Sequence, residues 1–172
     1  MIRPVDPANL VAITRIYGEA VRFGSASFEI DPPSLEEMTR RCETLTSAGF
    51  PYLVANIDGR VVGYAYAGPY RPRPAYRFTV EDSIYLDQAA RGLGLGRRLL
   101  TNLIERTTAM GMRQMIAVIG DSTNSPSIGL HEALGFEHAG VLRSVGWKHG
   151  RWLDSVLMQR HLGAGDTVMP KQ

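Results

Sequence analysis

A strand, a glycine-rich turn and a helix follow one another between residues 81 and 103, and this stretch constrains the fold more than any other part of the chain. Before the turn, apolar and polar residues alternate, which predicts a strand with Glu81 and Tyr85 on one face and Asp82 on the other. After the turn, apolar residues at helical spacing predict a stripe made of Leu95, Leu99, Leu103 and Ile104. The end of the strand and the start of the helix therefore meet at one turn.

The turn combines glycine with arginine, and its residues are Arg91, Gly92, Gly94, Gly96, Arg97 and Arg98. Glycine has no side chain, so the backbone can approach a ligand closely and can adopt positive φ angles. The first turn of a helix has unpaired N–H groups and a partial positive charge, which suit an anion. We therefore predict a pyrophosphate site here. A plain tight turn would explain one or two glycines, but not three glycines beside three arginines.

Three families of glycine loop could account for the turn, and spacing separates them. A P-loop requires Gly-Lys-Ser/Thr at its end, whereas Arg97 follows Gly96. A dinucleotide fingerprint requires G-x-G-x-x-G and an acidic residue about 20 residues later; the spacing here is G-x-G-x-G, and that acid is missing. The remaining pattern, R-x-x-G-x-G over Arg91, Gly94 and Gly96, resembles the acyl-coenzyme A pyrophosphate loop of the GCN5-related N-acetyltransferases.

Length, charge and cysteine content exclude several other classes. A chain of 172 residues suits one domain, and its net charge of +2 comes from scattered arginines, so we predict no nucleic-acid partner. The single cysteine, Cys42, has apolar neighbours at helical spacing, which favours a buried structural thiol over a nucleophile. No signal peptide and no membrane-length apolar run are visible. We expect a soluble, cytoplasmic protein with no membrane contact and no metal site.

Capping and turn residues predict the remaining elements. Helix starts are expected at Asp6 or Pro7, at Ser34 through a capping box with Glu37, and at Ser125 as N-cap. The other expected elements are a strand over 1–5, an aromatic-bearing loop over 22–33, a helix to about 47, a hairpin of strands 52–57 and 61–67, a strand over 112–119, a short helix that ends before Gly135, and two strands around a turn at 148–150.

Two features allow both a functional and a purely structural interpretation. The loop G-P-Y-R-P-R-P-A-Y is stiffened by prolines and carries Arg71, Arg73 and Tyr76, which suit recognition of a carboxylate. A solvated loop explains these residues equally well, but its position directly before the Glu81 strand favours function. His131 lies one helical turn from apolar residues on either side, where a buried core histidine is the more common outcome.

The order of the elements and five short segments resemble the phosphinothricin and methionine sulfoximine acetyltransferase branch of the GCN5-related family. The segments are AYAGPYRPRPAY, GLGLG, AVIG, LHEALGF and GWKHGRW, and the resemblance spans roughly residues 3–160. It implies an α/β fold with a central mixed sheet flanked by helices. It also implies a single domain over residues 1–162 with a loose tail over 163–172, acetyl-coenzyme A as co-substrate, and a homodimer.

The resemblance also assigns roles to residues. Glu81 would be the general base, directly or through water, and Asp82 is the alternative because the two side chains face opposite ways. In most of the superfamily a tyrosine thought to protonate the departing thiolate occupies the position of His131, whose role as a second base or as a donor to sulfur stays open. The substrate would contact Phe28, Arg71, Arg73, Tyr76 and Glu81. Acetyl-coenzyme A would contact Ile84, Tyr85, Leu86, Arg91, Gly92, Leu93, Gly94, Leu95, Gly96, Arg97, Asn124 and Ser127.

The function implied by the resemblance is transfer of an acetyl group from acetyl-coenzyme A to the α-amine of a small amino acid, such as phosphinothricin, methionine sulfoximine or methionine sulfone. Two other classes stay open. One is an acetyltransferase for protein, peptide or polyamine amines, which would favour an open acidic groove. The other is an acyl-coenzyme A binding module without turnover.

Overall fold

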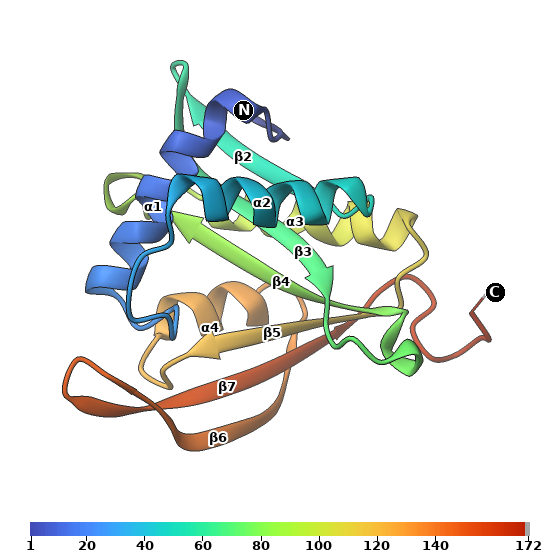
Figure 1. Cartoon of the computed structure of the whole chain (residues 1–172). Coiled ribbons are helices and arrows are strands. Elements are labelled where there is room, and N and C mark those ends of the chain that lie inside the picture. The colour runs from blue at the N-terminus through green and yellow to red at the C-terminus, as the bar shows by residue number, and fades with distance from the viewer. Residues whose placement is uncertain (171–172) are drawn as a thin grey trace.

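The computed structural model describes residues 1–170, and this range contains one mixed sheet in the order β1-β2-β3-β4-β5-β7-β6 (Figure 1). The strands are β1 (Ile2–Pro4), β2 (Tyr52–Ile57), β3 (Arg60–Pro69), β4 (Thr79–Leu86), β5 (Gln114–Gly120), β6 (Glu137–Lys148) and β7 (Arg151–His161). The α-helices are α1 (Leu10–Phe23), α2 (Leu35–Ser47), α3 (Leu95–Ala109) and α4 (Ser125–Glu132). The predicted α/β fold with a central mixed sheet is confirmed.

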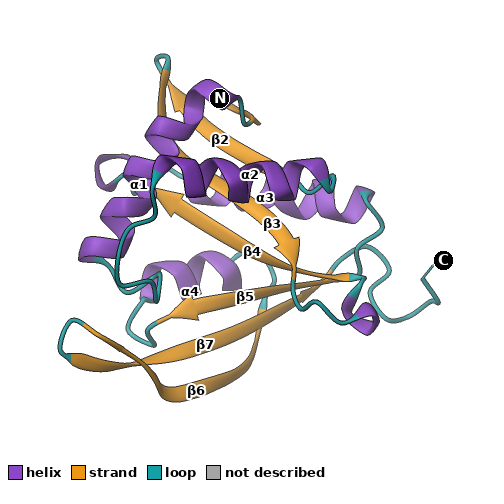
Figure 2. Ribbon diagram, viewed as in Figure 1, coloured by secondary structure: helices purple, strands orange, loops and turns teal. Residues whose placement is uncertain are grey.

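Helices cover both faces of the sheet (Figure 2). A separate apolar core fills each side. α1 and α2 pack on the face that carries Val54 and Tyr64, whereas α3 packs on the face that carries Ala65 and Val80. Adjacent strand residues such as Tyr64 and Ala65 belong to different cores because strand side chains alternate between the faces. Cys42 is buried in the core beneath α2, and desolvation raises the pKa of its thiol to about 11. This confirms the structural role predicted for the cysteine.

The first and last helices begin slightly differently from the sequence prediction. Asp6 caps a 3-10 turn, and α1 itself begins only at Leu10. In α4 the N-cap is Asn124 rather than Ser125, because the Asn124 side-chain oxygen accepts a hydrogen bond from the backbone N–H of Ser127 at 3.4 Å. Ser125 is therefore the first residue inside the helix.

At the start of α2, only half of the predicted capping box forms. The Ser34 hydroxyl accepts a hydrogen bond from the backbone N–H of Glu37 at 3.1 Å, as predicted. The Glu37 carboxylate does not return to the Ser34 backbone but pairs with Arg40 and Arg41 one turn ahead. These two guanidinium groups lower the pKa of Glu37 to about 2.

The predicted hairpins are confirmed, with small shifts at their ends. β2 and β3 pair around Asp58 and Gly59, which have φ angles of 47° and 81°. β6 and β7 pair around His149 and Gly150, which also have positive φ angles. β5 begins at Gln114 rather than at residue 112.

Among residues 1–170, no helix has both the length and the apolar character needed to cross a bilayer. Of the expected tail, residues 171 and 172 lie outside the described range.

β4 and β5 are the parallel pair of the sheet, and they pair over only part of their length. Residues 79–82 of β4 are in register with residues 114–117 of β5. Beyond Asp82 and Ala117 the two strands continue to Leu86 and Gly120 without further pairing. Figure 1 shows the two arrows separating in the middle of the sheet. The separation begins at the residues for which chemistry was predicted.

Candidate active site

A narrow cleft lies where β4 and β5 separate, with an enclosed volume of about 50 Å³. Four of the predicted cofactor contacts, Ile84, Tyr85, Asn124 and Ser127, line this cleft. Leu86 does not, because its side chain packs against the backbone of β3 at Gly63 and against α3. No residue of the glycine-rich turn lines the cleft; the turn follows the end of β4 at Leu86 and leads into α3 at Leu95.

The glycine-rich turn presents an open backbone at the start of α3. Gly92 and Gly94 have φ angles of 78° and 72°, and a Cβ atom on either would meet no atom within 4 Å. Gly94 is the N-cap of α3, so the N–H groups of the next three residues have no partner inside the helix. Arg91, Leu93 and Arg97 are exposed around the turn. Unpaired amides beside exposed arginines make this turn suited to a pyrophosphate.

Gly96 serves a different purpose from the other two glycines. It is buried inside α3, and a Cβ atom there would lie 3.2 Å from the Leu130 side chain of α4. The side chain of Leu95 is also in the core. Glycine at position 96 therefore permits close packing of two helices, a role that the sequence interpretation did not give it. Because both residues are buried, Leu95 and Gly96 can offer a ligand their backbone N–H groups and no side chains.

His131 pairs with Asp82 rather than lying on the face of Glu81. Its Nε2 atom lies 3.1 Å from Asp82 Oδ2, and its Nδ1 atom lies 2.7 Å from the Ser127 carbonyl oxygen. The side chains of His131 and Asp82 are 5% and 2% exposed. Phe136 packs edge-on against the imidazole ring, with 4.8 Å between ring centroids. The sequence interpretation gave the proton transfers to Glu81 and His131 without naming a partner for the histidine; the structure places its Nε2 beside Asp82, on the opposite face of β4 from Glu81.

Glu81 points to the face covered by α1 and α2, as the alternation predicted. It pairs in register with Gly68 of β3, and Tyr66 and Ser83 lie on the same face. Its side chain is half-buried. Desolvation and the negative charge of Asp82 raise the pKa of Glu81, while the positive charge of Arg71 opposes them. A carboxyl group with a raised pKa is a stronger base once ionised, which suits proton transfer.

The arginine-bearing loop lies on the surface and forms a small aromatic cluster. The Arg71 guanidinium carbon is 5.0 Å from the centroid of the Tyr70 ring, which in turn contacts Tyr76 edge-on. Arg71 interacts electrostatically with Glu81, the one link between this loop and the catalytic candidates among the interactions described. Arg73 is exposed and precedes a short 3-10 turn.

The loop after α1 contacts β5 and β6 near their C-terminal ends. The Phe28 ring lies against Gly120 of β5 and Gly146 of β6, where a Cβ atom would come within 3.0 Å and 2.5 Å of ring carbons. Lys148 Nζ donates a hydrogen bond of 2.7 Å to the Ser27 carbonyl oxygen, although this lysine is only 4% exposed. Burial lowers the pKa of Lys148. Sequence reasoning missed this buried lysine, because a lysine in a hairpin turn is usually solvated.

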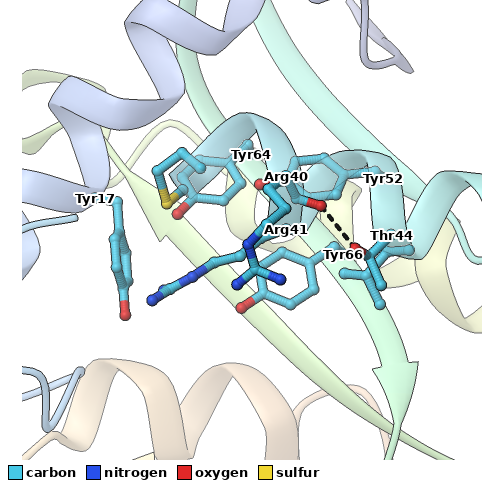
Figure 3. A pocket seen from close by; sticks show the side chains of 9 residues that line it. Tyr17, Arg40, Arg41, Thr44, Tyr52, Tyr64 and Tyr66 are labelled. Carbon is cyan, nitrogen blue, oxygen red and sulfur yellow. Dashed lines mark hydrogen bonds between the residues drawn. The ribbon is translucent and has the colours of Figure 1, made fainter. Parts of the chain in front are cut away.

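A second feature missed from the sequence is a tyrosine-lined cavity of about 280 Å³ beneath α2 (Figure 3). Figure 3 shows the rings of Tyr52, Tyr64 and Tyr66 beside Arg41, with Tyr17 closing one side. The Tyr64 hydroxyl is buried without a hydrogen-bond partner among the described residues. These tyrosines come from α1, β2 and β3, so no local pattern could have brought them together. Within the same described range, no cluster of three or more potential metal-ligating side chains is found.

A mixed sheet that opens between its parallel strands, with a glycine-rich turn at the end of one of them, defines an acyl-coenzyme A-dependent transferase. Comparison with known sequences agrees: a profile described as "Acetyltransferase (GNAT) family" matches residues 13–136. The chain belongs to this acetyltransferase family.

Individual relatives are similar over nearly the whole chain. A phosphinothricin N-acetyltransferase from Alcaligenes faecalis is 56% identical over 99% of this chain and 86% of its own length. An L-methionine sulfoximine/L-methionine sulfone acetyltransferase from Pseudomonas aeruginosa is 44% identical over 94% of both chains. The crystal structure of a phosphinothricin acetyltransferase from Sinorhizobium meliloti in complex with AcCoA matches with a TM-score of 0.98 and 51% identity, covering 100% of this chain and 93% of that one.

Proposed function

We propose that the enzyme transfers the acetyl group of acetyl-coenzyme A to the α-amine of a small amino acid such as phosphinothricin, methionine sulfoximine or methionine sulfone. The observation that carries the proposal is the half-buried Glu81 carboxyl group, whose pKa is raised and which lies where β4 and β5 begin to separate. The relatives named for phosphinothricin and for methionine sulfoximine and sulfone support the choice of substrate.

The path from Glu81 to the glycine-rich turn fits an extended coenzyme. A strand from Glu81 to Asp87 spans about 20 Å, at roughly 3.3 Å per residue. A pantetheine arm has a comparable reach, so a pyrophosphate at the amides after Gly94 would leave the thioester near Glu81. Exposed Arg91 and Arg97 would add positive charge beside the phosphates. The coenzyme supplies the activated acetyl group, and the protein supplies its placement and the proton transfers.

In the reaction, the neutral amine of the amino acid attacks the thioester carbonyl carbon. An α-ammonium group must first lose a proton, and Glu81 accepts it, directly or through one water molecule. A new C–N bond forms, the C–S bond breaks with its electron pair on sulfur, and a proton neutralises the thiolate. His131 lines the cleft between β4 and β5 and is the second titratable group that this scheme uses.

Recognition of the amino acid is assigned to the residues around the Glu81 face. A guanidinium group can hold a carboxylate in a fixed plane, which positions the neighbouring amine for attack. Arg71 is the stronger candidate because it is already coupled to Glu81, with Arg73 and Tyr76 on the same loop. Phe28 closes the other side of the site, where its ring is held against β5 and β6.

Release of free thiol from acetyl-coenzyme A in the presence of a panel of amines tests the proposal. We expect release with the three named amino acids and much weaker release with their methyl esters, which lack the carboxylate. Equal activity on the esters, or preference for peptides or polyamines, would contradict carboxylate recognition. If the protein bound acetyl-coenzyme A but released no thiol with any of the amines, it would be a coenzyme-binding module and not an enzyme for these substrates.

We also propose that the protein is a homodimer in the cytoplasm. The β6–β7 hairpin exposes apolar side chains, namely Val141, Leu142, Val145, Trp147 and Trp152. Several exposed apolar side chains on one hairpin favour association with a second chain. Light scattering of the purified protein tests the dimer, and replacing Trp147 with Lys should convert it to a monomer.

The cytoplasmic location is proposed from the cysteine content: a single buried thiol, Cys42, suits a reducing compartment. Fractionation of cells tests the location.

A further inference from the structure

The two nitrogen atoms of His131 are both engaged, and this limits where its protons can be. Nδ1 lies 2.7 Å from the Ser127 carbonyl oxygen, which can only accept, so Nδ1 carries a hydrogen. Nε2 lies 3.1 Å from Asp82 Oδ2. With Nδ1 already protonated, the contact between Nε2 and Oδ2 requires one more hydrogen, either on the imidazole or on the carboxyl group. The pair therefore holds one proton more than a neutral imidazole beside a carboxylate.

The surroundings favour that proton on His131. A buried carboxylate without a positive partner is costly, and an imidazolium at hydrogen-bond distance offsets the cost. Burial alone would lower the pKa of His131, but the hydrogen bond to Asp82, the charge of Asp82 and the Ser127 carbonyl outweigh it and raise this pKa. Asp82 Oδ1 is buried without a hydrogen-bond partner among the described residues, so His131 is the group that compensates the carboxylate.

We propose that Asp82 is a positioning residue that keeps His131 protonated in the β4–β5 cleft, so that His131 donates a proton to the sulfur of departing coenzyme A. This inference rests on the proposed acetyl transfer. As the C–S bond breaks, its electron pair stays on sulfur, and sulfur takes the hydrogen from Nε2. His131 becomes neutral with its hydrogen on Nδ1, and Asp82 remains a carboxylate. Glu81 holds the proton from the amine, which passes to solvent, and His131 regains one from solvent.

The same geometry decides between the two roles that the sequence left open for His131. A second base must have a nitrogen lone pair available, but Nδ1 donates to Ser127 and Nε2 is protonated toward Asp82. A protonated imidazole can only give a proton. Both residues line the cleft between β4 and β5, whereas Glu81 lies on the opposite face of β4, so the proton is held on the side of the cleft and not on the side of the amine.

An NMR titration of the His131 imidazole in the whole protein, with and without the substitution Asp82→Asn, tests the inference. Asparagine has nearly the shape of aspartate but no negative charge. We expect a doubly protonated His131 in the unmodified protein at neutral pH, and a lower His131 pKa in the variant. Asp166→Asn, which removes an exposed carboxylate, is the matched control and should leave the titration unchanged. A neutral His131 in the unmodified protein would overturn the inference without any need for the variant to fold.

The pH dependence of kcat adds a second readout. A proton donor must be protonated, so kcat falls as the pH rises through its pKa, and Asp82→Asn should move this alkaline limb to lower pH. Asp82 also raises the pKa of Glu81, the other ionisable group next to it on β4, so the acidic limb should move the same way. The expected loss in kcat is about tenfold or more. An alkaline limb that stays in place in a folded variant would contradict the role of Asp82. Absence of thiol release in the unmodified protein would instead refute the proposed function, while the NMR result would still stand.

Discussion

Glu81 and Asp82 are neighbouring carboxyl groups on β4, and the two faces of the sheet give them different environments. Asp82 faces α4, is almost fully buried and is tied to His131. Glu81 faces the tyrosine-rich side, is half-buried and is coupled to Arg71 on a surface loop. In the reaction proposed above, the same functional group is a proton acceptor near the substrate on one face and the partner of a charged histidine on the other. Two residues next to each other in sequence can therefore serve opposite ends of one reaction.

The largest expected effect is on kcat, and it distinguishes Glu81 from Asp82. Glu81→Gln should lower kcat by roughly a hundredfold or more, because the amine loses its base. Binding of acetyl-coenzyme A should be nearly unchanged, since the glycine-rich turn is far along β4. Steady-state kinetics and a binding titration measure both quantities, with Asp82→Asn as the matched variant. Near-normal kcat for Glu81→Gln across the pH range, together with a larger loss for Asp82→Asn, would reassign the base to Asp82.

A second difference concerns stability. His131→Ala should lower the free energy of unfolding by about 3 kcal/mol, because it leaves Asp82 buried without its partner. Glu81→Gln should change it by less than about 1 kcal/mol, since this side chain is half-buried and has no buried counter-charge. Urea denaturation at pH 7 compares the two variants directly. Equal decreases in the free energy of unfolding would contradict the difference in burial and charge pairing between the two faces.

The smallest expected effect is that of Arg71→Ala on the pH dependence of kcat. Its positive charge lowers the pKa of Glu81, so Arg71→Ala should raise that pKa. A base must be ionised, and kcat should therefore begin to fall at a higher pH as the solution is acidified. KM for the amino acid should rise roughly tenfold, the effect of losing one charge-assisted contact. Arg73→Ala is the control: it should leave the acidic limb in place. A shift of that limb by both substitutions would show that the effect is not specific to Arg71.

Much of the site could be predicted because its parts are local in sequence. The strand alternation placed Glu81 and Asp82 on opposite faces, and the spacing of Gly92 and Gly94 indicated an open turn before a helix; both agree with the structure. Contacts with residues distant in sequence were not predicted. Gly96 packs against Leu130 of another helix, and no pattern within its own segment signals that contact.

The sequence by itself determined the order of strands and helices, the glycine-rich turn and the membership of a known family, because periodicity, caps and turns depend on residues within a few positions of one another. Tertiary structure alone decided which groups meet. His131 and Asp82 are 49 positions apart, and Lys148 reaches Ser27 across 121 positions. Such contacts depend on how β4 and β5 pair and where α4 docks, and they determine burial, charge and pKa. The tertiary arrangement therefore paired His131 with Asp82, a partner that the sequence alone did not indicate.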